Sequence, residues 1–235
     1  MIAVLRRELG GYFKGMLGYL FAAFMLIFAG IYTMAYNLSG MTAGFEYVVS
    51  AIAFIYLIAV PILTMRTIAE ERRQKTDQLL YALPVSLTAV VAGKYLALLC
   101  VLALPCLIMA LYPLILMQFG AVPLLPAYGA LIAFFMLGAC LLAVGLLVSS
   151  VTDSPVAAAV MTLLAMLLLY FIGDLASFLP SGLIREIMTQ LSVFDRFDTF
   201  IGGVFDLTAV VYYGSIIGVC LFVTVQVLER RRWSA

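Results

Sequence analysis

The chain has 235 residues, of which 66% are hydrophobic and 11% are charged, and its formal net charge is +1. A soluble domain is roughly half apolar and about a quarter charged, so this composition excludes a water-soluble globular protein, and no nucleic-acid partner is expected. The sequence contains no histidine, which excludes Ser-His, Cys-His and His-ligated metal chemistry.

Residues 1–16 predict a short interfacial helix that leads into the first membrane span. Its apolar residues fall on one helical side and its basic residues on the other flank. No small-residue cleavage site follows the first hydrophobic run, so we expect that run to be a retained helix. The apolar side consists of Ile2, Leu5, Leu9, Tyr12 and Phe13.

Uncharged runs predict six transmembrane helices, because a span needs roughly 20 apolar residues. Asp174 lies near the end of the fifth run, where we expect it at the membrane interface or against protein. The connecting segments are short and polar, so the sequence predicts a single all-α membrane domain over residues 1–235, with the lipid bilayer around it. The runs cover residues 17–36, 47–65, 95–117, 127–148, 156–178 and 207–228.

Basic residues gather in alternate connections between these helices. Of the 13 Lys and Arg residues, only Arg185 and Arg196 lie on one side. The others precede the first helix, join the second to the third, or follow the sixth. The positive-inside rule therefore predicts that both termini are cytoplasmic.

The segment at residues 67–82, after the second helix, is rich in charged residues and strong helix formers, and Pro84 stops it. Its few apolar residues include Ile68, Leu79 and Leu80. A charged helix with apolar residues at its end is typical of a docking element for a soluble partner. A solvated loop helix explains the same composition equally well.

A second cytoplasmic contact is predicted at residues 149–155, between the fourth and fifth helices. Thr152, Asp153 and Ser154 precede Pro155 there, which is a helix-start signal.

The outer connection at residues 180–206 predicts two amphipathic helices. In the second, Phe194, Phe197, Ile201, Val204 and Phe205 face away from Asp195, Arg196 and Asp198. Ser192 is placed to cap its start. Such pieces lie in the headgroup layer, form a re-entrant hairpin packed on protein, or simply close the fold.

The cytoplasmic run AEERRxxTxxLLxxxPVS, followed by a Gly-Lys pair, resembles the hallmark of permease subunits of type 2 ABC exporters. In that family this run forms an elbow and a coupling helix that seats in the ATPase subunit. The resemblance implies a partner ABC ATPase that holds ATP and Mg, a second permease copy, and no cofactor on this chain. The matching positions are Glu70, Glu71, Arg72, Arg73, Thr76, Leu79, Leu80, Pro84, Val85, Ser86, Gly93 and Lys94.

Within that class, the chain is most similar to the gliding-motility-type permeases. The similarity lies in RREL-x-x-YF at residues 6–13 and in FDRFDTFIGGVFDLTAVVYYGS at residues 194–215. It implies a bacterial inner-membrane location and a partner with a large extracytoplasmic domain. Such a system could transmit mechanical work without moving a solute, although the uncharged helices favour a lipidic, amphipathic or peptide-like cargo.

Two rival classes fit less well. Gly173-Asp174 has a faint similarity to intramembrane aspartyl proteases, but the preceding glycine is replaced by Phe171 and no partner aspartate lies in another helix core. An ion-coupled transporter would place acidic groups at mid-membrane, and these helices have none there. No G-x-x-x-x-G-K-[ST] loop is present, because Tyr95 follows Gly93-Lys94.

Glycines predict close helix packing at two places. Gly138 and Gly145 share one face of the fourth helix, and Gly214 and Gly218 form a GxxxG in the sixth. Packing within the chain explains both pairs, and a dimer seam is a second reading of the GxxxG.

Overall fold

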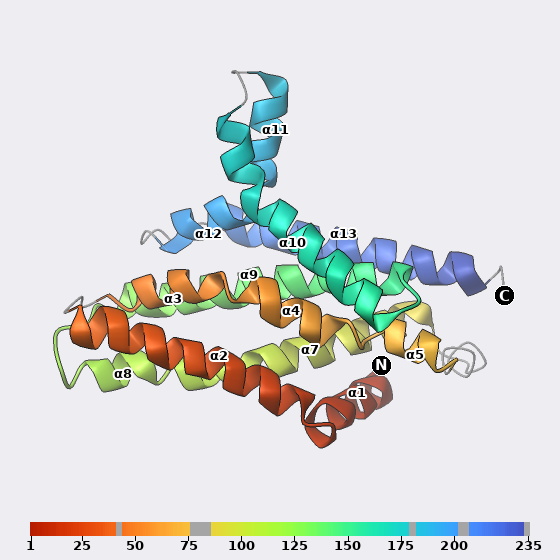
Figure 1. Ribbon diagram of the computed structural model, residues 1–235, viewed down its shortest axis with the longest axis horizontal. Helices are drawn as coiled ribbons and strands as arrows, with labels where there is room; N and C mark the ends of the chain where they lie inside the picture. Colours follow the sequence, from red (N-terminus) through yellow and green to blue (C-terminus); the bar gives the residue numbers. More distant parts are fainter. Residues whose placement is uncertain (41–43, 76–85, 179–181, 202–206, 233–235) are drawn as a thin grey trace.

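The computed structural model describes residues 1–40, 44–75, 86–178, 182–201 and 207–232, and these residues contain helices and no strands (Figure 1). This confirms the predicted all-α class. The elements are α1 (Ile2–Lys14), α2 (Leu17–Thr33), the π-helix η1 (Met34–Ser39), α3 (Glu46–Ala53), α4 (Tyr56–Thr64), α5 (Ala69–Arg73), α7 (Leu87–Met109), α8 (Tyr112–Leu116), α9 (Leu124–Val151), α10 (Pro155–Ser177), α11 (Leu183–Leu191), α12 (Val193–Ile201) and α13 (Leu207–Arg232).

Five helical segments in the described part are long and apolar enough to cross a membrane. They become six if the bent pair α3 and α4 counts as one span. The predicted six helices therefore agree with the structure. The spanning segments are Leu17–Ser39, Leu87–Leu116, Leu124–Val151, Pro155–Ser177 and Leu207–Arg232.

The second span, predicted as one uncharged run over residues 47–65, is bent. Its two halves, α3 and α4, meet at a bend of 55°. Backbone bonds at the junction are of the tighter i to i+3 kind, from Ile55 N to Ile52 O and from Leu57 N to Phe54 O. Pro61 inside α4 weakens the same span, because it cannot donate a backbone hydrogen bond.

The third span begins earlier than predicted. Helix α7 starts at Leu87, after Ser86, whose hydroxyl accepts a hydrogen bond from Ala89 N as an N-cap. Gly93 and Lys94 therefore lie inside the helix and not in the connection before it. Gly93 is where α1 crosses α7, because an added Cβ would lie 3.1 Å from the Val4 side chain.

Helix α9 is the centre of the bundle. In its most apolar stretch of 18 residues, 67% of the residues are buried, whereas the corresponding share for α10 is 17%. It contacts α3, α4, α7, α10, α12 and α13. Gly138 and Gly145 explain how α4 approaches so closely, since an added Cβ would lie 2.7 Å from the Tyr56 hydroxyl and 2.6 Å from Thr64 Oγ1, respectively. Gly214 and Gly218 have no neighbouring atoms within 4 Å of an added Cβ, so packing within the described chain does not explain them.

The two outer helices behave differently. Helix α12 packs on α9 and buries Val193, Phe194, Phe197 and Phe200, whereas α11 buries none of its residues and lies beside the end of α10 (Figure 1). The predicted cap is confirmed, because Asp195 N donates to Ser192 Oγ at 3.2 Å.

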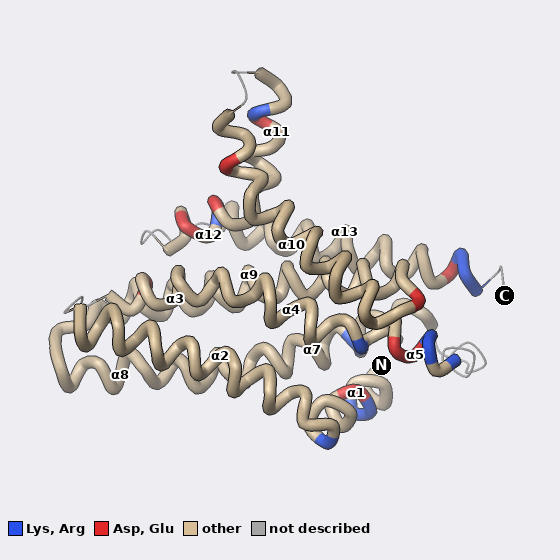
Figure 2. Tube along the Cα trace, viewed as in Figure 1, with Lys and Arg blue, Asp and Glu red and all other residues tan. Residues whose placement is uncertain are grey.

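Charged residues gather at one end of the bundle. Figure 2 shows α1, α5 and the end of α13 there, with most of the Lys and Arg residues that the structure describes. Away from this end, α11 projects from the side of the bundle and α12 lies along it, and both carry acidic residues with few basic ones.

Candidate functional site

The candidate site is built around α5, at the charged end of the bundle. The sequence predicts a continuous helix over residues 67–82, and the structure corrects both its start and its continuity. Helix α5 ends at Arg73, and Lys75 has a positive φ of 55°. Thr67 and Ile68 form a turn, with Thr67 N bonded to Thr64 O, and the helix begins at Ala69. Of the predicted docking residues, Thr76, Leu79 and Leu80 lie outside the described residues.

The first turn of α5 is capped by a residue from another helix. Ser149 Oγ of α9 accepts hydrogen bonds from Ile68 N at 3.3 Å and from Ala69 N at 3.1 Å. The Thr67 hydroxyl also donates a hydrogen bond to Ser149 Oγ, at 3.2 Å. Helix starts carry backbone N–H groups without intrahelical partners, and here a neighbouring span supplies the acceptor. This cap fixes α5 to α9.

A buried lysine joins α5 to α1 and α7. The ammonium Nζ of Lys94 lies 2.9 Å from Glu8 Oε1, 2.8 Å from Glu71 Oε1 and 2.9 Å from Thr67 O. Its side chain is 2% exposed, and those of Glu8 and Glu71 are 15% and 17% exposed. All three ammonium donors have acceptors, which is the condition for burying a charge without a large penalty.

Helix α1 completes this cluster. Arg7 lies 3.8 Å from Glu71, and Tyr12 is buried in the same region. Burial, with the nearby charges of Glu8 and Glu71, raises the pKa of the Tyr12 hydroxyl well above its usual range. The tyrosine therefore stays neutral at any physiological pH.

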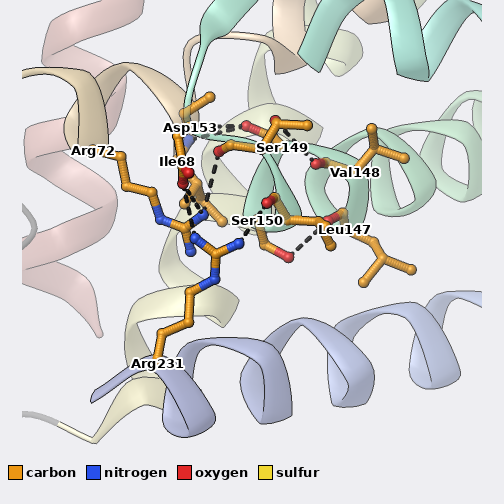
Figure 3. Close-up of polar contacts among 11 residues, drawn as sticks. Ile68, Arg72, Leu147, Val148, Ser149, Ser150, Asp153 and Arg231 are labelled. Atoms are coloured by element: carbon orange, nitrogen blue, oxygen red, sulfur yellow. Dashed lines mark hydrogen bonds and ion pairs between the residues drawn. The ribbon is translucent and has the colours of Figure 1, made fainter. Parts of the chain in front are cut away.

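A second cluster joins α5 to the α9–α10 turn and to α13. Figure 3 shows Arg72 and Arg231 converging on Asp153, with distances to Asp153 Oδ1 of 3.1 and 2.8 Å. The same guanidiniums donate to backbone carbonyls at the end of α9, Arg72 to Thr152 O and Arg231 to Val151 O. Cations at a helix C-terminus also interact favourably with the helix dipole.

We expect this second cluster to respond to acid. The hydrogen bond from Arg231, with the charges of Arg231 and Arg72, lowers the pKa of Asp153. Because the folded-state pKa is the lower one, the stabilisation is present above the ordinary value of 3.8 and is lost as pH falls through the folded-state pKa. The difference in melting temperature between the native chain and Asp153→Asn should therefore shrink between pH 6 and pH 3. A difference that does not change with pH would show that the carboxylate charge is not what stabilises the turn.

Several of the predicted docking residues lie at this end of the bundle, in two separate clusters. Arg72 contacts Thr152 and Asp153, whereas Glu71 pairs with Lys94, so both Glu71 and Arg72 are used in internal ion pairs. Arg73 is exposed and Glu70 is partly exposed. Glu8 and Arg231 were missed, whereas Lys94 was named only as part of the Gly-Lys pair and Ser149 only as the first residue of the turn at 149–155. The pair of Lys94 and Glu8 could have been inferred from the sequence. A lysine inside an apolar helix requires an acidic partner, and the RREL run contains Glu8.

Within the part of the chain that the structure describes, the charged side chains of α12 form no ion pair. Asp195 and Asp198 are exposed on α12, and the Arg196 guanidinium lies 4.8 Å from the centre of the Tyr212 ring. Although the residue as a whole is exposed, desolvation of its carboxyl group and the neighbouring charge of Asp195 raise the pKa of Asp198, against a hydrogen bond with Ser50 that lowers it. Asp174 is exposed near the end of α10. Among the described residues, no group of three His, Cys, Asp or Glu could hold a metal ion.

Comparison with known proteins gives one family. A family model described as ABC-2 family transporter protein matches residues 36–225. The match includes α5, Ser149, Asp153 and the outer helices. The matched range does not include Glu8 or Arg231. No curated protein matches the chain.

Proposed function

The chain belongs to the ABC-2 transporter family, and we propose that the end of the bundle that carries α5 is the surface on which its ATPase partner docks. Proteins of this family are membrane permease subunits without an ATPase of their own, so ATP is hydrolysed on a partner subunit. The observation that carries the proposal is the attachment of α5 to several other helices at once.

The contacts of α5 make it suited to transmit force. Ser149 fixes it to α9, Lys94 to α7, and Asp153 to the turn before α10. Packed elements move as rigid bodies when domains rotate against one another. A push on α5 by a closing ATPase would therefore reach three spans through short contacts, without any need for the long straight helix that the sequence predicts.

Two groups of side chains remain available to a partner at this surface. Arg73 and Gln74 are exposed at the end of α5, and Asp153 is 77% exposed although it accepts from two arginines. The rest of the segment predicted to dock, residues 76–82, continues from this point in the chain. We propose that these residues together form the ATPase contact.

The distribution of charge supports the orientation that docking requires. The basic end of the bundle in Figure 2 contains α1, α5 and the end of α13. By the positive-inside rule this end is cytoplasmic, where ATP is available, and both termini lie there. We further propose the bacterial inner membrane as the compartment.

Two finer assignments rest on sequence resemblance. The blocks at residues 6–13 and 194–215 support a permease of the gliding-motility type, which works as a dimer with a second permease copy. They also support a partner with a large extracytoplasmic domain, for which the outer helices α11 and α12 leave room. Transmission of mechanical work across the membrane is then the proposed output.

The test separates the exposed residues of α5 from its internal ones. In the variant Glu70→Arg/Arg73→Glu, net charge is unchanged and neither Lys94 nor Asp153 loses a partner. We expect the ATPase that co-purifies with the tagged chain from its native membranes to fall about tenfold, with an unchanged melting temperature. A tenfold loss corresponds to about 1.4 kcal/mol of binding free energy.

The matched control is Arg185→Glu/Glu186→Arg on α11, the same exchange of charges at the other end of the molecule. It should leave co-purification at the native level. Equal recovery of the ATPase by the α5 variant and the native chain would place the docking surface elsewhere.

A further inference from the structure

An apolar groove runs between α2 and α4 at the charged end of the bundle. It has a volume of about 150 Å³ and is lined only by hydrophobic residues. Cavities of that size hold a benzene-sized molecule, so the groove accepts part of an acyl chain. The lining residues are Leu17, Leu20, Phe21 and Phe24 of α2, and Ala59, Ile62 and Leu63 of α4.

The groove opens toward the membrane. Its floor is buried, with Phe21 at 6%, Ala59 at 2% and Leu63 at 0% exposure. Its rims are exposed, since Leu20 and Ile62 are among the exposed large hydrophobic residues. The residues of α2 that line it follow the i, i+3, i+4, i+7 pattern of one helix face. A hydrocarbon chain in the bilayer can therefore enter from the side.

Two basic residues lie close along the chain to residues that line this groove. Lys14 precedes Leu17 by three residues, and Arg66 follows Leu63 by three. Both are exposed, and among the described residues neither forms a hydrogen bond or an ion pair. Other basic residues nearby, such as Arg72 and Lys94, are used in internal ion pairs.

From this combination we infer a binding site for one anionic phospholipid of the bilayer, with an acyl chain between α2 and α4 and the phosphate at Lys14 and Arg66. Apolar burial supplies affinity for any lipid tail, and the two cations supply preference for a negative headgroup. The site is separate from the proposed ATPase contact, because no groove residue belongs to α5 or to the α9–α10 turn.

The site fills a gap between the first two spans. Helix α2 follows α1 after Met16, whose φ of 61° interrupts the helix between them, and α4 leads into α5. A lipid between them contacts the two spans that connect to the charged clusters. It would hold α2 and α4 together where their own side chains leave space.

Fluorescence quenching can test the site. The chain's single tryptophan, Trp233, is replaced by Phe, and Phe24 in the groove is replaced by Trp. The full chain is then placed in bilayers of brominated phosphatidylglycerol or brominated phosphatidylcholine mixed with unlabelled phosphatidylcholine. We expect stronger quenching by the anionic lipid, with a relative affinity of roughly fivefold for each basic residue engaged.

Three further variants test where the headgroup and the acyl chain bind. Lys14→Gln/Arg66→Gln should abolish the preference for the anionic lipid, whereas Arg6→Gln/Arg73→Gln, which removes the same charge from other exposed positions, should retain it. Ala59→Phe fills the floor and should reduce quenching by both lipids.

Three results would overturn the inference. Equal quenching by both lipids would mean a non-selective lipid contact, and a preference that survives Lys14→Gln/Arg66→Gln would place the headgroup elsewhere. No quenching by either lipid would mean that protein, such as a second copy, covers the groove. None of these results depends on ATPase docking.

Discussion

Replacing Lys94 with methionine is expected to be the most damaging single change at the α1–α5–α7 junction. Without the ammonium group, the carboxylates of Glu8 and Glu71 would face each other, each less than a fifth exposed. Breaking a buried ion pair by removing one partner typically costs about 3–5 kcal/mol. The expected result is a clear fall in the melting temperature of the detergent-solubilised chain.

A triple variant distinguishes loss of charge balance from loss of packing. Glu8→Gln/Glu71→Gln/Lys94→Met removes all three charges together, and neutral replacements of buried ion clusters are often tolerated. We expect it to recover most of the stability that Lys94→Met loses. Arg6→Met, an exposed position on α1, should have little effect. An unchanged melting temperature for Lys94→Met would show that the cluster does not stabilise the fold.

The sequence was sufficient for the coarse architecture because the membrane imposes it. Five spans are single helical segments close to their predicted positions, and their uncharged runs leave the backbone no alternative to helix in lipid. The family match to residues 36–225 also removes the intramembrane-enzyme and ion-coupled alternatives, which were argued from single residues such as Asp174.

The predictions that were wrong concern features of the fold that hydropathy does not determine. The bend between α3 and α4 lies in a run that is apolar on both sides, so hydropathy does not mark the change of direction, and Pro61 is the residue there that weakens regular helix. Lys94 was assigned to a connection because it is charged. Instead, it lies inside α7, since Glu8 and Glu71 come from distant parts of the chain to neutralise it.

The same reason explains why the site was only partly predicted. Glu71 and Arg72 could be named from motif resemblance and Asp153 from the helix-start signal before Pro155, but which partners they meet depends on tertiary packing. Ser149 is a small polar residue near a helix end, and nothing in the sequence indicates that it caps another helix.

Helix α9 connects this site to the bundle core through one of its faces. Gly145 and Ser149 are four residues apart and therefore lie on the same side of α9. Gly145 receives Thr64 of α4, and Ser149 caps the start of α5 immediately after it. The depth at which α4 packs thus determines whether the cap on α5 can form.

Gly145→Leu is accordingly expected to damage both stability and ATPase docking. Its Cβ would lie 2.6 Å from Thr64 Oγ1 and 2.9 Å from Thr64 Cβ, too close to the α4 backbone for a side-chain rotation to relieve. Overpacking of this kind costs about 1–3 kcal/mol or more. A lower melting temperature and reduced co-purification of the ATPase are the measurements.

The same substitution at Gly214 provides the control, because a Cβ there would meet no atom within 4 Å. Gly214→Leu should leave the melting temperature of the solubilised chain near the native value, which would attribute the effect at Gly145 to the α4–α9 contact and not to leucine in a membrane helix. If Gly145→Leu lowered stability but left ATPase recovery intact, α5 would be positioned independently of α4, and the cap by Ser149 would not be what links the docking surface to the core.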